Sequence, residues 1–168
     1  MRWLLSLSVM LLVAGCCGFH AQQSPPPSTR QMLGESAGVT PAVRAACERV
    51  NVLVSGTPGA MVETYGGAVA DEMLGRSTSG CTIVISGSWR ELGTGRSPAD
   101  LIFESLSAEG WRQEVEYAAD GPDGTMFGLS KDRVLCIVRG DWDGGDDADS
   151  TYVPSDVYQV IVRCVEKK

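Results

Sequence analysis

From residue 111 onward, apolar and polar residues alternate with a period of two, the pattern of strands that bury one face. In the first such stretch the apolar side consists of Trp111, Val115 and Tyr117, with charged residues between them. Turn sequences rich in Asp, Gly and Lys separate it from three more stretches, at 125–130, 133–139 and 157–165. The four stretches predict an antiparallel meander. The last strand is expected to bury Tyr158, Val160, Val162 and Cys164.

Before residue 111, apolar residues recur at helical spacing. Thr40 and Pro41 form a helix start, in which a capping hydroxyl precedes proline at the first helical position. The apolar positions that follow lie three or four residues apart: Val43, Cys47, Val50 and Val54. The end of this stretch, 50–54, also fits a short strand.

Thr57 and Pro58 repeat the start signal and predict a second helix that ends at Gly75. Its apolar side would contain Met61, Val62, Tyr65, Ala68, Val69 and Met73. Gly66 and Gly67 lie in its middle, where each costs about 1 kcal/mol relative to alanine. We therefore expect either a close packing partner at these glycines or a weak helix.

A strand followed by a capped helix is predicted between residues 81 and 110. The stretch 81–86 is short, apolar and rich in β-branched residues. Ser97 and Asp100 have the spacing of a capping box, and Gly110 ends the helix. Its buried face is expected to contain Leu101, Ile102 and Leu106.

These elements predict a single α+β domain over residues 40–168. We expect a two-layer sandwich, in which two to three helices cover one face of a mainly antiparallel sheet of about four to five strands. The composition agrees with a globular domain, since 43% of the residues are hydrophobic and 21% are charged. The formal net charge of −7 disfavours nucleic-acid binding and docking on anionic lipid through a basic patch.

The N-terminus has the organisation of an export signal. Arg2 precedes an apolar stretch at 4–13, which is too short to span a bilayer of about 30 Å. Its end, Val13-Ala14-Gly15-Cys16, resembles the lipobox of bacterial lipoproteins. The resemblance implies that a signal peptide, 1–15, is removed and that Cys16 is acylated and attaches the protein to a membrane.

The position after the lipidated cysteine bears on the membrane that is reached. In that family, a lipoprotein without aspartate directly after its lipidated cysteine usually goes to the outer membrane. Here the residue after Cys16 is Cys17, so the resemblance implies an outer-membrane lipoprotein that faces the periplasm or the surface. Residues 16–39, which include three consecutive prolines, predict a flexible tether. Cleavage after Ala21 would instead release a soluble secreted protein.

Four of the six cysteines lie within the predicted domain: Cys47, Cys81, Cys136 and Cys164. An even number of spread cysteines in an exported chain predicts two disulfides. Cys136 and Cys164 lie on strands that we expect to be neighbours, which favours pairing them and leaves Cys47 with Cys81, although three pairings are possible. Zinc is not expected, because the sequence has no C-x-x-C pair and its one histidine, His20, lies in the tether.

Five carboxylates crowd a glycine-containing stretch: Asp141, Asp143, Asp146, Asp147 and Asp149. Such a loop suits Ca²⁺, which prefers six to eight oxygen ligands, but the spacing is not that of an EF-hand. A solvated acidic loop between two strands is the other interpretation. Ca²⁺ is thus the one cofactor that we consider, and the alternative is no cofactor.

Trp89 and Trp142 lie close to predicted loop ends. If both are exposed, they predict a recognition surface beside the acidic stretch, because aromatic residues are enriched at interfaces. Packing in the core is the alternative for each. An envelope protein is the partner that such a surface would bind.

The sequence does not predict an enzyme. Without a histidine in the domain, Ser-His and Cys-His arrangements are excluded. A Ser-Lys dyad would depend on Lys131, Lys167 or Lys168, which lie in a turn and at the C-terminus. A carboxylate-dependent hydrolase needs two carboxylates about 5–10 Å apart in a sheltered cleft, and acids on one loop lack that shelter. A lipid-anchored binding domain is the favoured function, and a calcium-binding structural module is the alternative.

Overall fold

The computed structural model describes residues 31–32, 38–71, 75–93, 95–121, 124–143, 151, 153 and 155–167. The helices are α1 (Pro41–Val54), α2 (Trp89–Leu92) and α3 (Pro98–Ala108). The strands are β1 (Gln31–Met32), β2 (Met61–Asp71), β3 (Arg76–Ser88), β4 (Arg112–Gly121), β5 (Gly124–Lys131), β6 (Val134–Trp142) and β7 (Val157–Glu166). None of the helices in this part of the chain is long and apolar enough to cross a membrane.

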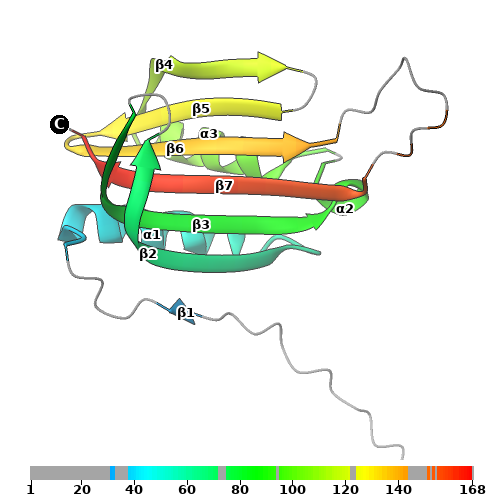
Figure 1. The fold of residues 1–168 in the computed structure, drawn as a ribbon, viewed down its shortest axis with the longest axis horizontal. Helices are drawn as coiled ribbons and strands as arrows, with labels where there is room; N and C mark the ends of the chain where they lie inside the picture. The colour runs from blue at the N-terminus through cyan, green and yellow to red at the C-terminus, as the bar shows by residue number, and fades with distance from the viewer. Residues whose placement is uncertain are drawn as a thin grey trace, which may run out of the picture.

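The strands form one sheet in the order β1-β2-β3-β7-β6-β5-β4 (Figure 1). Every pairing is antiparallel except that of β1, a two-residue strand parallel to β2. β1 lies in the stretch for which we predicted a tether. The α+β class is therefore correct, and the predicted meander is the β4-β5-β6-β7 half of the sheet. The predicted number of four to five strands is too low, because β2 to β7 alone are six.

The two predicted capped helices are confirmed. The Thr40 hydroxyl accepts a hydrogen bond from the Val43 amide (3.4 Å), and Ser97 with Asp100 forms the capping box. The predicted apolar positions of α1 are all buried, as are Ile102 and Leu106 of α3, while Leu101 is half-buried. The alternative of a strand at 50–54 is wrong, because α1 continues to Val54.

The predicted second helix at 58–75 is wrong. Residues 61–71 form β2, which pairs with β3 along its whole length, from Met61 opposite Ser86 to Asp71 opposite Arg76. Apolar and β-branched residues at these positions also fit a pleated surface, and the ladder with β3 supplies the backbone hydrogen bonds along that edge of β2. Gly67, which would weaken a helix, has a φ of 148°, a conformation that is open to glycine.

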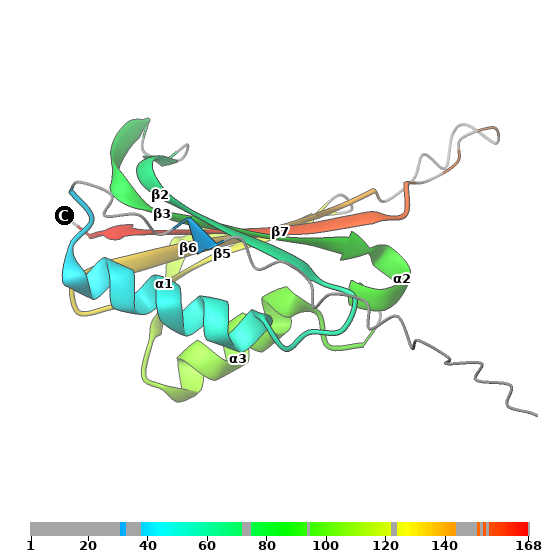
Figure 2. The same cartoon turned by 90° about the horizontal axis from the view of Figure 1, so that it is seen from below.

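The main core lies between the helices and one face of the sheet (Figure 2). The faces of α1 and α3 pack against the inward side chains of the central strands. All four residues predicted for the buried face of the last strand belong to this core: Tyr158, Val160, Val162 and Cys164. The alternation of β7 was thus predicted correctly.

A second, smaller core lies on the opposite face of the sheet. The end of the β2-β3 hairpin bends away from the sheet on the side that α1 and α3 leave open (Figure 2). The five buried residues of this outer core are Val69, Tyr117, Leu135, Ile137 and Val165. The described domain therefore buries apolar side chains on both faces of the sheet. The sequence predicted a core on one face only, under the helices.

The edge strand β4 departs from the predicted alternation. Its register with β5 shifts between Glu114 and Ala119, which marks a bulge. Trp111 packs at the margin of the main core, but Val115 is 83% exposed and Tyr117 is buried in the outer core. The predicted common apolar face for these three residues is wrong, because extra residues in a strand reverse the direction of the side chains that follow.

Candidate functional site

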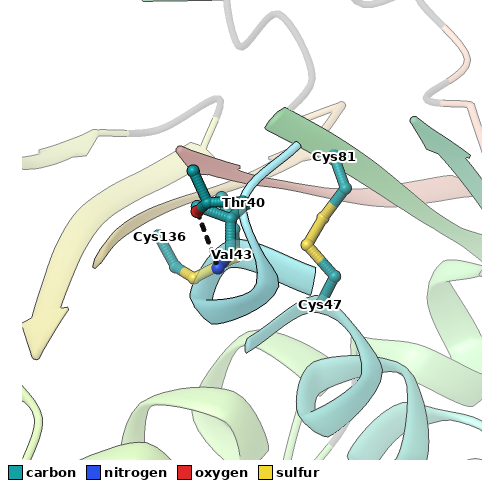
Figure 3. The surroundings of a disulfide bond; sticks show 6 residues. Thr40, Val43, Cys47, Cys81 and Cys136 are labelled. Carbon is teal, nitrogen blue, oxygen red and sulfur yellow. Dashed lines mark hydrogen bonds between the residues drawn. A yellow bond between two sulfur atoms is a disulfide. The ribbon is translucent and has the colours of Figure 1, made fainter. Parts of the chain in front are cut away.

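Two disulfides hold the main core together. Cys47 of α1 is bonded to Cys81 of β3 (Figure 3), and Cys136 of β6 is bonded to Cys164 of β7. The Cα atoms of the two pairs are 6.5 and 4.0 Å apart. This is the pairing that the sequence favoured, and it is confirmed.

The two disulfides lie next to each other. The Sγ atoms of Cys47, Cys81 and Cys164 lie within 4.8 Å of one another, and each of the four cysteines is at most 1% exposed. Three sulfurs at such distances suit a soft metal ion, but a metal ligand has to be a thiolate. Because the sulfurs are joined in disulfides, this group is a covalent part of the core.

Three aromatic rings meet at the end of the sheet where β6 ends and β7 begins. The Trp89 centroid lies 5.7 Å from that of Trp142 and 5.3 Å from that of Tyr158, and the last two centroids are 6.2 Å apart. We call these three residues the aromatic cluster. The structure thus brings together the two predicted binding residues, and it adds a tyrosine that the sequence assigned to the core.

Trp89 is the outermost member of the aromatic cluster. It is 37% exposed, whereas Trp142 is half-buried and Tyr158 is buried. Its indole lies over Gly93, where a Cβ would come within 2.0 Å of the ring. The Trp89 ring is therefore held between the backbone of the short helix α2 and two other rings, while the residue as a whole stays partly exposed.

Asp156 fixes the start of α2. Its backbone oxygen accepts a hydrogen bond from the Trp89 amide (2.8 Å), and its carboxylate accepts one from the Ser88 hydroxyl (2.9 Å). Ser88 caps α2 and also accepts a hydrogen bond from the Arg90 amide (3.1 Å). Because Asp156 directly precedes β7, these bonds connect the position of Trp89 to the sheet.

The Tyr158 phenol is held in its neutral form. Burial raises its pKa above the ordinary value, the nearby carboxylates of Asp100 and Asp141 raise it further, and a hydrogen bond with Ser97 acts in the opposite direction. A neutral, buried ring supports the two indoles as an apolar surface. The aromatic cluster is therefore a packing feature, without a group that titrates near neutral pH.

The acidic stretch is described only in part. The Asp141 carboxylate accepts a hydrogen bond from the Arg139 guanidinium (2.7 Å), and that of Asp143 accepts one from the Ser155 amide (2.7 Å). Both predicted ligands therefore already have protein partners. The other three predicted ligands, Asp146, Asp147 and Asp149, lie outside the described residues.

A serine, a lysine and a glutamate meet where β4, β5 and the C-terminus come together. The Glu114 carboxylate accepts hydrogen bonds from Ser130 and Lys167, and the Lys167 Nζ lies 3.5 Å from the Ser130 Oγ. The bond from Lys167 is the main cause that lowers the pKa of Glu114, and the bond from Ser130 adds to it. The sequence missed this contact, because Glu114 was expected on the polar side of its strand and Lys167 lies 53 residues away.

This arrangement does not suit catalysis by a serine-lysine pair. An ammonium group bound to a carboxylate has no lone pair with which to accept the serine proton, and a carboxylate with a lowered pKa is a weak base. Glu114 and Lys167 instead form an ion pair that ties β4 to the segment after β7, and Ser130 adds a hydrogen bond to Glu114. These contacts of Glu114, Ser130 and Lys167 are therefore expected to stabilise the fold.

A shallow cavity of about 300 Å³ opens where the bulge of β4 separates from β5. The rings of Phe103 and Phe127, which meet edge to face with centroids 5.2 Å apart, form part of its wall, and Asp120 also lines it. No family model, characterised protein or solved structure matches the chain. The function has therefore to be inferred from these residues alone.

Proposed function

We propose that this protein is a lipid-anchored component of the cell envelope whose disulfide-stabilised domain binds an envelope protein through the aromatic cluster. Cys16 carries the lipid, and residues after it connect the membrane to the domain. Trp89 makes the central contact, and Trp142 supports it.

Two features favour this location. The N-terminal sequence ends in Val13-Ala14-Gly15-Cys16, the arrangement that resembles a lipobox. The domain contains two disulfides, and disulfides persist in oxidising compartments outside the cytoplasm. A signal for export and a core that requires oxidation are consistent with each other.

The exposure of Trp89 is the observation that carries the binding proposal. Tryptophan is the residue type most enriched among residues that dominate binding energy, and a rigidly held ring loses little conformational entropy when a partner covers it. Trp89 is held on three sides by Gly93, Trp142 and Tyr158, yet it remains 37% exposed. A partner that covers this ring gains apolar contact at little ordering cost.

Site-specific photo-crosslinking in living cells tests the proposal. A photoreactive residue replaces Arg90, whose side chain is 86% exposed beside Trp89, and in a matched chain it replaces Val52, which is 67% exposed on α1. We expect one discrete adduct from position 90 and none from position 52. Adding Trp89→Ala to the first chain should abolish the adduct. Absence of an adduct at position 90, or equal adducts at both positions, would contradict the proposal.

A further inference from the structure

Cys164 lies between two other cysteines in the sheet. In the β6-β7 ladder it is directly opposite Cys136, to which it is bonded, and in the β3-β7 ladder it is directly opposite Cys81. The three side chains point to the same face of the sheet, because directly paired residues share a face. Cys47 reaches them from α1 above that face.

The distances permit a bond that the structure does not contain. Directly opposed residues of antiparallel strands have Cα atoms about 4.5–5.5 Å apart, which lies within the range of about 4.4–6.8 Å that disulfides occupy. The Sγ atoms of Cys81 and Cys164 already lie within 4.8 Å of each other. Cys81 and Cys136 differ in this respect: β7 separates them, so they are about 10 Å apart and cannot be bridged.

We propose that the four cysteines can exchange disulfide partners by thiol–disulfide exchange. Reduction of either native disulfide allows a bond to form between Cys81 and Cys164. A dithiol reductant supplies two electrons and converts Cys47–Cys81 into two thiols. The Cys81 thiolate then attacks the Cys164 Sγ, the Cys81–Cys164 bond forms, and the Cys136–Cys164 bond breaks. Cys136 leaves as a thiolate and takes up a proton. The exchange step itself consumes no electrons.

The same bond is reached from the other disulfide. When Cys136–Cys164 is reduced, the Cys164 thiolate attacks the Cys81 Sγ and Cys47 leaves. Both routes therefore lead to one product that links the adjacent strands β3 and β7. With all four cysteines oxidised, the native pairing is retained, because the alternative bond leaves Cys47 and Cys136 without partners. This exchange is independent of the proposed binding function.

Variants of the full chain in which one of the four domain cysteines is serine test the exchange without a reductant, because each leaves one thiol among the three remaining domain cysteines. In all of them Cys16 and Cys17 are also serine, so that no other thiol is present. In Cys47→Ser we expect the thiol to be shared between Cys81 and Cys136, with the shared state reached faster as pH rises, because the thiolate is the nucleophile. Acid quenching, alkylation and peptide mapping locate the thiol.

A second variant and a matched control keep the test independent of folding. Cys136→Ser should give the Cys81–Cys164 bond with a thiol at Cys47. Cys164→Ser leaves a thiol at Cys136 beside an intact Cys47–Cys81 bond, and there we expect the thiol to stay at Cys136. Near-UV circular dichroism checks that each variant is folded. In urea the chain is unfolded, and there the disulfide of all three variants should exchange among the remaining cysteines. The proposal would be overturned by a thiol that stays at Cys81 in folded Cys47→Ser, or by one that stays at Cys164 or appears at Cys81 in folded Cys136→Ser.

Discussion

The Tyr117 side chain packs directly on the backbone of Gly128: a Cβ at residue 128 would lie 2.9 Å from the Tyr117 Cβ. Gly128 belongs to β5, and Tyr117 lies within the register shift of the neighbouring strand β4, between Glu114 and Ala119. The missing side chain at Gly128 makes the space into which the Tyr117 ring folds. The contact accompanies the burial of the Tyr117 ring in the outer core.

Gly128→Ala should therefore destabilise the domain. The added methyl group overlaps a ring that neighbouring residues hold in place, and overpacking of this kind costs about 1–3 kcal/mol. Urea unfolding at neutral pH measures the loss. Gly121→Ala is the matched control on the adjacent strand, because a Cβ there meets nothing within 4 Å. Equal unfolding free energies for the two variants would contradict the packing of Tyr117.

Each disulfide should contribute comparably to stability. The bonded cysteines are separated by 34 and 28 residues in the sequence, and loops of this length correspond to about 3–4 kcal/mol in the chain-entropy account. The variants to compare are Cys47→Ser/Cys81→Ser and Cys136→Ser/Cys164→Ser. Replacing both partners of a pair avoids the thiol that would exchange. A double variant that unfolds at the same urea concentration as the parent chain would contradict the assignment of that bond.

The Glu114–Lys167 pair should make stability depend on pH in the acid range. Because the pKa of Glu114 is lowered in the folded state, the pair stabilises the fold above the pKa of an unfolded glutamate, about 4.3. This contribution is lost as pH falls through the lower folded pKa. Glu114→Gln should reduce stability at pH 7 and weaken its decline in acid, as measured by urea midpoints from pH 7 to pH 3. Glu116→Gln, on an exposed position of the same strand, should follow the parent chain.

Calcium should leave the melting temperature unchanged. The Arg139 guanidinium already neutralises Asp141, and Asp143 is held by the Ser155 amide, so the two described carboxylates offer a cation little unpaired charge. The test compares thermal unfolding in millimolar Ca²⁺ and in EDTA, because a ligand that binds only the folded state raises the midpoint. A midpoint that rises with Ca²⁺ and loses this rise in Asp143→Asn would contradict the expectation and favour the calcium-binding module.

Local signals in the sequence predicted the helices and the disulfides. The start of α1 at Thr40 and the capping box of Ser97 depend on residues within one turn, so neighbours in the sequence suffice. The pairing of Cys136 with Cys164 followed from two strong strand patterns, each of which the structure confirms. The strand β2 was missed because its apolar residues also fit a helical period, and only the complete pairing with β3 distinguishes the two.

The candidate site was predicted only in part. Trp89 and Trp142 were identified as a pair from their positions near loop ends, and the structure brings their rings into contact. Tyr158 was assigned to the core from its alternation, which is correct, but nothing in its own segment indicates that it supports two indoles. The Glu114–Lys167 pair depends on a bulge and on a long-range contact, and neither has a signal in the sequence.

Anchorage at Cys16 is the central claim, because the proposed binding of an envelope protein next to a membrane depends on it. Mass spectrometry of the mature N-terminal peptide from membranes tests it directly. We expect a peptide that begins at Cys16, carries acyl chains and disappears in Cys16→Ser, with the protein then leaving the membrane fraction. A mature chain that begins after Ala21 without lipid, or one that keeps Arg2 and the apolar stretch, would contradict the account.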